Sequence, residues 1–182
     1  SGNKEALLEV QKDLEVLGYQ NYSKITSVYL KNTINGRTFA GTSTSFTLDS
    51  RALSFLLQFL GIPTGDKVVT SYEVPLFVRD GTKYVKREFL RALFGCDADK
   101  PKWKGMNFYA LSLRQNKSIF LKENMNVYYS QLQELFLEFG INSYTYIRNK
   151  NEIRTRDNTP VLTFNLTITP NNENLFKYYS KI

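Results

Sequence analysis

The sequence predicts an α+β protein made of repeated blocks of helices and strands. The main observation is a pair of amphipathic helices, each followed by a glycine. In the first, apolar residues recur at helical spacing before Gly18, namely Leu7, Val10, Leu14 and Leu17. In the second, "YYSQLQELFLEFGI" has the same pattern, and Gly140 takes the place of Gly18. A glycine at this place is typical of a helix C-terminus.

Each of these helices is followed by two predicted strands and another helix. Residues 23–32 and 37–48 are strands around a turn at 33–36, and residues 51–61 form a helix that Asp49 or Ser50 can cap. Residues 143–150 and 160–168 are the matching strands, and residues 171–182 are the matching helix. The order of elements is the same in both blocks.

The two blocks align at a constant offset of 122 residues, without a gap, over about 54 residues. This offset pairs Gln11 with Gln133 and Thr47 with Thr169. Leucine-rich helices align easily by chance, so the shared order and spacing carry more weight than the identities. We interpret the pattern as an internal duplication.

The residues between the blocks extend the second one. "GIPTGDKV" is a turn and "YEVPLFVRDG" an extended segment, followed by a helix over 85–97 and strands over 105–115 and 118–122. The predicted division is therefore 1–61 as a partial first unit, 62–84 as a connecting segment and 85–182 as a complete second unit. We expect a helix and two strands to precede Asn3 in the native molecule.

Composition favours an anionic partner and excludes several kinds of site. The formal net charge is +7 and the pI is about 9.4. The chain has no histidine, which excludes Ser-His-Asp and Cys-His catalysis and histidine-ligated zinc. Carboxylates, carbonyls and water would have to hold any metal, and these ligands suit Mg²⁺.

The cysteine count and hydropathy bear on where the protein resides. Cys96 is the single cysteine, so it cannot pair within the chain. No run of about 18 apolar residues predicts a membrane span. We expect an intracellular protein, cytoplasmic or, in a eukaryote, nuclear or organellar.

Acidic residues close the helix over 85–97, where the helix dipole favours cations. This stretch, "FLRALFGCDADKPKW", together with "LQFLGIPTGDK" and "YEVP", resembles the LAGLIDADG family of homing endonucleases, in particular the dodecapeptide type found in inteins. In "LRALFGCDA", Leu90 is the first residue of the signature, Asp97 is at the acidic position, and Ala98 stands where glycine is usual.

The resemblance implies αββαββα units whose curved antiparallel sheets bind double-stranded DNA. Two motif helices would pack side by side, with Ala92 and Gly95 allowing close approach. Asp97, with Ala98 as a further ligand, would bind Mg²⁺ or another divalent cation for phosphodiester hydrolysis. Asp99 is the alternative acid because helix ends are uncertain by a residue or two. Apart from the resemblance, Asp97 could be a surface acid paired with Lys100, Lys102 or Lys104.

Two features depart from the family pattern. Only one motif helix is present, so the partner acid would come from a second copy through residues 85–97 or from a missing N-terminal piece. The strand ends "TSFTLDS" and "FNLTITPN" lack the usual basic residue, which leaves Lys117 or Lys150 to supply it. A catalytically inactive DNA- or RNA-binding module is therefore one alternative. A structural protein with incidental positive charge is another.

Strand alternation selects the residues expected to contact DNA. Tyr144, Tyr146, Arg148 and Lys150 share one strand face, and Asn165 and Thr167 lie on the polar face of the next strand. Further cations come from the preceding hairpin and the loop between the strands: Arg114, Lys117, Lys122, Arg154 and Arg156. Arginine, lysine and asparagine suit base edges, whereas cations in loops more often contact phosphate.

Overall fold

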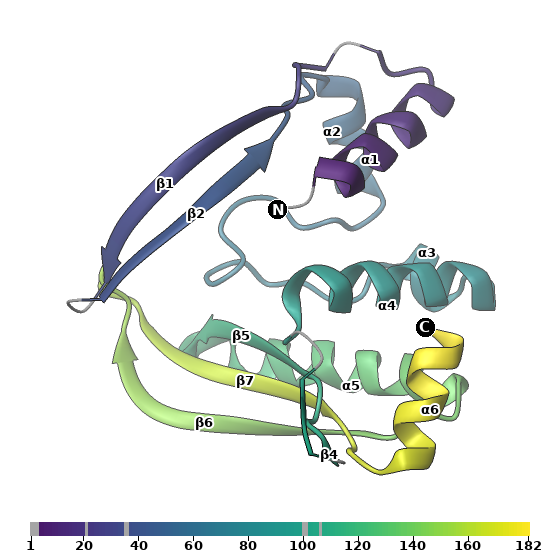
Figure 1. The fold of residues 1–182 in the computed structure, drawn as a ribbon, viewed down its shortest axis with the longest axis vertical. Coiled ribbons are helices and arrows are strands. Elements are labelled where there is room, and N and C mark those ends of the chain that lie inside the picture. Colours follow the sequence, from purple (N-terminus) through teal and green to yellow (C-terminus); the bar gives the residue numbers. More distant parts are fainter. Residues whose placement is uncertain (1–3, 21, 35–36, 100–101, 106) are drawn as a thin grey trace. The chain divides into compact units, whose positions relative to one another are not determined.

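A computed structural model describes residues 4–20, 22–34, 37–99, 102–105 and 107–182. The chain forms two compact units, Ser1–Phe55 and Leu56–Ile182. Figure 1 shows their elements. The predicted division into a partial unit, a connecting segment and a complete unit stays a prediction.

Unit 1 contains α1 (Lys4–Val16), β1 (Thr26–Ile34), β2 (Arg37–Ser45) and the start of α2 (Arg51–Phe59). β1 and β2 form an antiparallel hairpin in which Thr26 lies opposite Ser45. Among the described side chains of this unit, those of Gln11 and Thr44 are buried. Unit 1 thus has very little apolar core of its own.

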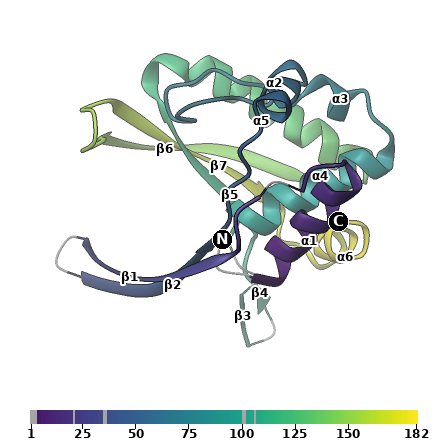
Figure 2. The same cartoon turned by 90° about the horizontal axis from the view of Figure 1, so that it is seen from above.

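Unit 2 carries a three-stranded antiparallel sheet covered by helices. In chain order it contains α3 (Leu76–Arg79), α4 (Lys83–Asp97), β3 (Trp103–Lys104), β4 (Asn107–Phe108), β5 (Ser112–Ser118), a 3-10 turn (Ile119–Leu121), α5 (Lys122–Glu138), β6 (Ser143–Ile153), β7 (Pro160–Ile168) and α6 (Asn172–Lys181). The sheet order is β5-β7-β6, and α5 packs against all three strands (Figure 2). β3 and β4 form a separate short hairpin.

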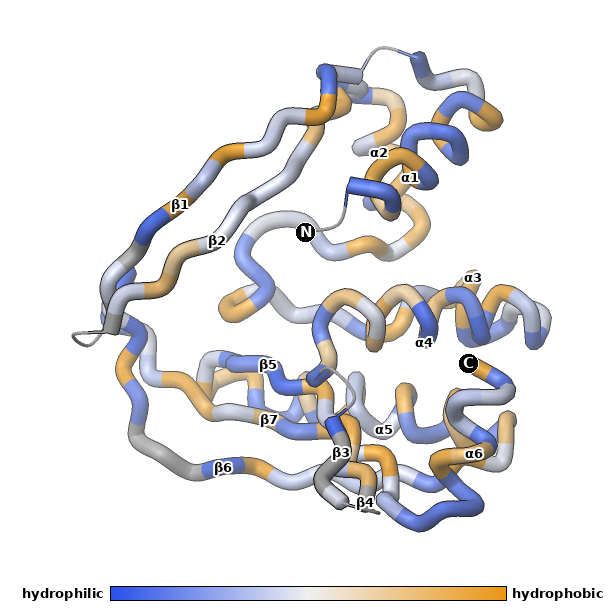
Figure 3. The backbone as a smooth tube through the Cα atoms, in the orientation of Figure 1, coloured by the Kyte–Doolittle hydropathy of each residue, from blue (hydrophilic) through white to orange (hydrophobic). Residues whose placement is uncertain are grey.

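The core of unit 2 lies between one sheet face and the helices. Leu113 and Leu166 from the sheet and Leu132 from α5 are fully buried. Phe94 of α4 meets Phe136 of α5 edge to face, with ring centres 4.9 Å apart. Figure 3 shows the matching alternation of hydrophobic and hydrophilic residues along α4. This packing fixes how α4 is rotated, and therefore where its C-terminal acids lie.

The structure confirms the predicted α+β class and the two helix ends predicted at Gly18 and Gly140. Gly18 and Gly140 have φ of 84° and 70°. Each donates to a carbonyl three residues back, and the next residue donates five residues back, as in a Schellman cap. The part of the chain that the structure describes contains no helix long and apolar enough to cross a membrane.

Three predicted segments differ from the structure. The single strand expected over 105–115 is divided into β4, which ends at Phe108, and β5, which begins at Ser112 in another sheet. Residues 76–79, expected to be extended, form α3 because Pro75 starts the turn and Val78 is buried in the core. Residues 118–122, expected to be a strand, end β5 and form the 3-10 turn, and α5 begins at Lys122 rather than near Tyr128. Met125, Tyr128, Tyr129 and Leu132 are buried at helical spacing, which favours the longer helix.

Candidate nucleic-acid interface and catalytic acid

α4 is held in place at both of its ends. Thr82 accepts a hydrogen bond from the Val85 amide at the N-terminus, and Leu90 and Phe94 are buried along its length. Ala98 then pairs with Leu113 of β5 in a single β-bridge. The chain thus leaves α4 directly onto the edge of the sheet.

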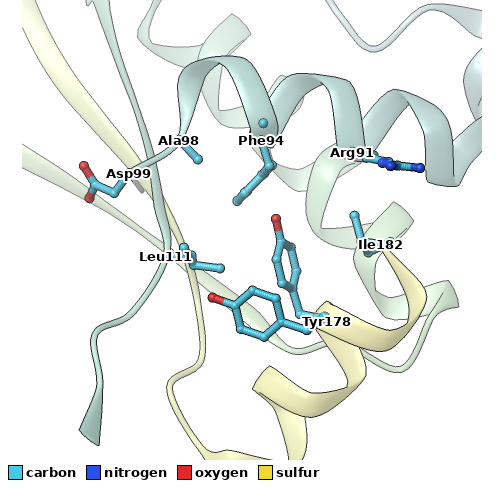
Figure 4. A pocket seen from close by; sticks show the side chains of 9 residues that line it. Arg91, Phe94, Ala98, Asp99, Leu111, Tyr178 and Ile182 are labelled. Atoms are coloured by element: carbon cyan, nitrogen blue, oxygen red, sulfur yellow. The ribbon is translucent and has the colours of Figure 1, made fainter. Parts of the chain in front are cut away.

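The two acids at the foot of α4, its C-terminal end, have different partners. Asp97 Oδ2 lies 3.2 Å from Lys67 Nζ, whereas Asp99 Oδ2 lies 3.0 Å from Arg114 Nη2. The Asp99 amide donates to the Ser112 carbonyl. Figure 4 shows the Asp99 carboxylate turned away from the aromatic rings of Phe94 and Tyr178, which line a cavity of about 270 Å³ on this side of α4. Asp99 is tied to the sheet, and Asp97 to a loop.

The Lys67 partner was not among the expected lysines. It lies 30 residues before Asp97 in the sequence. Lys100 and the side chain of Lys104 lie outside the described residues, and Lys102 is exposed. No local spacing in the sequence could pair Lys67 with Asp97, because their contact depends on how the loop over 62–71 folds back.

The loop over 62–71 is held in a defined turn. Gly65 has a φ of 88°, and Asp66 accepts hydrogen bonds through Oδ1 from the Val68 amide and through its backbone carbonyl from the Thr70 amide. The Val68 amide, followed by the side chain of Arg154, holds the pKa of Asp66 below its usual value. The turn places Lys67 at its outer side, toward α4.

A second cavity, of about 190 Å³, lies beside the Asp97–Lys67 pair. Both residues line it, together with Phe89 and Leu93 from α4 and Gln115 from β5. Phe89, Leu93 and Asp97 are spaced by four residues, so they share one face of the helix. Asp97 is therefore at the edge of a mainly apolar hollow and remains accessible.

The small residues predicted for motif-helix packing are on the surface of α4. Ala92 and Gly95 are both exposed. A Cβ atom added at Gly95 would meet nothing within 4 Å. The predicted interface through these residues stays a prediction.

The outer face of the sheet brings the expected DNA contacts together. The strand register aligns three rows across β5, β7 and β6: Ser112–Thr167–Tyr144, Arg114–Asn165–Tyr146 and Asn116–Thr163–Arg148. Tyr144 and Tyr146 are 44% and 46% exposed, and their rings stack with centres 6.2 Å apart. Asn165 and Thr167 are only 2% exposed, and both lie on the central strand of the sheet. Arg114, Asn116, the two tyrosines and Arg148 are the exposed residues of these three rows.

Lys117 is the clearest departure from the predicted contacts. It is three residues from Arg114, and alternation therefore puts the two side chains on opposite faces of β5. Its exposed fraction is 0%, and Nζ donates to the carbonyls of Lys67, at 2.8 Å, and Thr70. Burial lowers the pKa of the amine to about 8. Lys117 cannot contact DNA from this position, nor reach in as a catalytic cation.

The remaining predicted cations lie around the sheet. Lys122 is exposed at the start of α5, rather than on a strand. Arg154 forms ion pairs with Asp66, at 2.6 Å, and with Asp157. The Arg156 side chain is 76% exposed and 3.5 Å from Asp66. The side chain of Lys150 lies outside the described residues.

The acids present fit part of a magnesium site. Within the described ranges, no three His, Cys, Asp or Glu side chains gather closely enough to hold a metal ion. Mg²⁺ is commonly held by one or two carboxylates together with water and substrate phosphates. Asp97 and the Ala98 carbonyl could supply two oxygen ligands to Mg²⁺. A DNA phosphate and a second acid would supply further ligands.

The sequence was compared with models of known protein families. The family model described as "LAGLIDADG-like domain" matches residues 84–182, more than half of the chain. The chain belongs to the LAGLIDADG-like family. This membership confirms the resemblance seen in the motif helix, and it makes the chain a nuclease or a nucleic-acid-binding module.

Relatives of this LAGLIDADG-like chain are found inside much longer proteins. It is 32% identical to part of the replication factor C small subunit of Methanocaldococcus jannaschii, over 95% of this chain and 9% of that protein. It is also 32% identical to part of the tRNA-splicing ligase RtcB of Methanopyrus kandleri, over 100% of this chain and 18% of that protein. The match to the DNA-directed RNA polymerase subunit Rpo1N of M. jannaschii covers 77% of this chain and 11% of that protein, at 32% identity. The chain thus spans less than a fifth of each relative. No solved structure matches it significantly.

Proposed function

We propose that this LAGLIDADG-like chain is the DNA-cleaving region of a sequence-specific homing endonuclease. The observation that carries the proposal is the pair formed by Asp97 and Lys67, 3.2 Å apart beside the sheet edge that bears Arg114. An acid that can hold a divalent cation and a lysine that can neutralise a phosphate stand together there. They adjoin the strand whose outer face carries an arginine.

The outer face of the sheet has the chemistry to read a duplex. Arg114 and Arg148 can each donate two hydrogen bonds to the guanine edge in the major groove. Tyr144 and Tyr146 add an exposed surface of rigid, amphipathic rings to the same sheet face. Arg156 at the hairpin turn is suited to a phosphate contact, which positions the protein without reading sequence.

Hydrolysis would divide its tasks among a few residues. Asp97 and the Ala98 carbonyl would hold Mg²⁺, which supplies positive charge to the phosphate and lowers the pKa of bound water. Lys67 would turn its ammonium from Asp97 to the phosphate and stabilise the charge that develops there. Lys67 would thereby replace the basic residue that is usual at a strand end in this family and that both strand ends of this sequence lack.

A second acid is needed for cleavage of both strands. The exposed side of α4 that carries Ala92 and Gly95 would receive a second motif helix, from another copy or from a preceding segment of the same protein. Glycine and alanine allow helix backbones to approach closely. The two Asp97-type acids would then stand next to each other at the foot of the helix pair.

The distribution of relatives supports an inserted element of the intein type. Segments similar to this chain occupy a small share of three proteins with different names: a replication factor subunit, a tRNA-splicing ligase and an RNA polymerase subunit. One module within such different proteins is what an insert would give. The chain has no histidine, so we do not expect it to splice by itself.

The competing function is DNA or RNA binding without cleavage. It is favoured by the Lys67–Asp97 pair itself, because the lysine neutralises the acid that a metal would need. The pair is exposed, and exposed ion pairs contribute only about 0–1 kcal/mol. A divalent cation together with a DNA phosphate can therefore compete with Lys67 for Asp97.

Cleavage of a random-sequence duplex pool in Mg²⁺, followed by sequencing of the broken ends, tests the proposal. We expect recurrent cut sites with the native protein and none with Asp97→Asn. Asp80→Asn is the matched control, because Asp80 is an exposed acid at the end of α3. Salt-sensitive binding without cuts by any variant would favour the binding module. Cuts that persist in Asp97→Asn would exclude Asp97 as the essential metal ligand.

A further inference from the structure

We propose that Lys117 is a positioning residue that fixes the loop over 62–71 and so holds Lys67 at Asp97. The inference rests on the proposed function, in which the Lys67 ammonium acts at the foot of α4. It gives a task to a fully buried amine that neither DNA contact nor metal binding uses.

The amine of Lys117 contacts both the loop and the segment that follows it. Its Nζ donates to the Lys67 carbonyl at 2.8 Å and to the Thr70 carbonyl. The same Nζ stands 3.6 Å from the ring centre of Tyr72, a cation–π contact. The amine therefore holds the backbone of the very residue whose side chain reaches Asp97.

The loop needs these donors because of the way it turns. Its amides at Val68, Val69 and Thr70 are satisfied by Asp66, which leaves carbonyls to be paired on the other side. The end of β5 supplies the missing donors: the Ser118 amide bonds the Val68 carbonyl at 2.9 Å, and Lys117 bonds the carbonyls on either side of it. A lysine ammonium has three N–H donors on a flexible side chain, so it can donate to both carbonyls at once. A backbone amide has a single N–H and could donate to one of them.

The far side of Lys117 is fixed as well. Asn124 of α5 accepts from the Tyr72 amide at 3.1 Å and donates to the Tyr72 carbonyl at 3.0 Å. Gln131, two turns along α5, accepts from the Val74 amide at 2.8 Å. The segment after the loop is thereby tied to a core helix. The Tyr72 ring therefore has a fixed position beside the Lys117 amine. The hydrogen bonds from α5 also keep the end of the loop close to β5.

The effect of Lys117 on Lys67 is therefore through the backbone. With the Lys67 carbonyl held, only the side chain of Lys67 is free to turn between Asp97 and a phosphate. Without Lys117, the loop can move by an ångström or more, and misplacement on that scale can cost about 10²-fold in rate.

A double-mutant comparison on a cleaved DNA site tests the proposal. We expect Lys117→Met to lower the single-turnover cleavage rate about 10²-fold, with DNA affinity unchanged, because Lys117 does not face the DNA. In a Lys67→Met background, the same change should add little, since the group it positions is already gone. Equal losses in both backgrounds would overturn the proposal.

A matched control separates positioning from loss of stability. Asn174→Ala also removes buried hydrogen bonds, but at α6, where Asn174 serves Asn142 and Thr169. We expect it to lower the melting temperature without a comparable loss of cleavage rate. If it lowers the rate as far as Lys117→Met does, a merely structural role for Lys117 is sufficient. Should Lys117→Met fail to fold, Lys117→Gln, which keeps an amide donor, takes its place.

Amine labelling provides a readout that does not depend on cleavage. Each lysine is acetylated briefly, and its rate is measured by mass spectrometry. Asp97→Asn removes the partner of Lys67, and we expect it to raise the Lys67 rate about 2–5-fold, as suits an exposed ion pair.

Lys117→Met should raise the Lys67 rate as much, with the rate at exposed Lys122 unchanged. An unchanged Lys67 rate would refute positioning by Lys117, whether or not the native protein cuts DNA. Absence of cleavage by the native protein, with the labelling result as expected, would instead refute the proposed function alone.

Discussion

The pH dependence of stability gives a direct check on the burial of Lys117. Burial lowers its pKa from 10.5 to about 8. Between these two values the unfolded chain binds a proton that the folded chain does not, so the free energy of unfolding rises with pH. Integrated from pH 7 to 9.5 for one proton, the rise is about 1–2 kcal/mol after an allowance for solvent screening.

Buried tyrosines should reverse this trend at higher pH. Burial, with a smaller contribution from the Asp97 charge, raises the pKa of Tyr72 to about 12, and burial also raises the pKa of Tyr178 to about 12. A raised pKa of this kind contributes stability that is lost as the pH rises above 10, the ordinary tyrosine value. The native protein should therefore be most stable near pH 9–10.

Urea unfolding at a series of pH values measures this directly. Far-ultraviolet circular dichroism follows the loss of the helices, most of which lie in unit 2. Lys117→Met should abolish the rise between pH 7 and 9.5 and keep the fall above pH 10. A flat native curve, or the same rise in the variant, would refute the argument that Lys117 is buried as a charged amine.

Three further substitutions test the fold and the DNA face. Arg156→Ala should reduce the slope of log K against log salt for DNA binding by about 0.9, because its exposed guanidinium is assigned to one phosphate, and Lys177→Ala, on α6, should leave the slope unchanged. Equal slopes for both variants would argue against a phosphate contact by Arg156. Gly65→Ala should destabilise unit 2 by about 1–2 kcal/mol in urea unfolding, because Gly65 has a φ of 88°; no loss would show that the turn relaxes. Asn174→Ala should cost about 1–3 kcal/mol, because buried carbonyls lose their donors, and unaltered stability would contradict the hydrogen bonds to Asn142 and Thr169.

Local signals in the sequence predicted the C-terminal ends of α1 and α5 well. Gly18 and Gly140 follow apolar residues at helical spacing, and both adopt the positive φ that a Schellman cap requires. The outer sheet face was also predictable, since alternation alone groups Tyr144, Tyr146 and Arg148. In each case the deciding interaction lies within a few residues along the chain.

Features that depend on distant parts of the chain were not predicted. Residues 76–79 form α3 because Val78 is buried against the core of unit 2, which no local pattern shows. Lys67 meets Asp97 across 30 residues of sequence. Lys117 was expected on the DNA face for its charge, although its odd separation from Arg114 already indicated the opposite face.

Titration of the protein with Mn²⁺ in the presence of duplex DNA, followed by electron paramagnetic resonance, would show which acid holds the metal. Native protein, Asp97→Asn and Asp99→Asn are compared, because the two acids lie on either side of Ala98 and have different partners, Lys67 and Arg114. We expect Asp97→Asn to weaken Mn²⁺ binding at least about tenfold, or about 1.4 kcal/mol. Asp99→Asn should leave it nearly unchanged. Equal binding by the native protein and Asp97→Asn, or a loss confined to Asp99→Asn, would contradict a metal-dependent nuclease centred on Asp97.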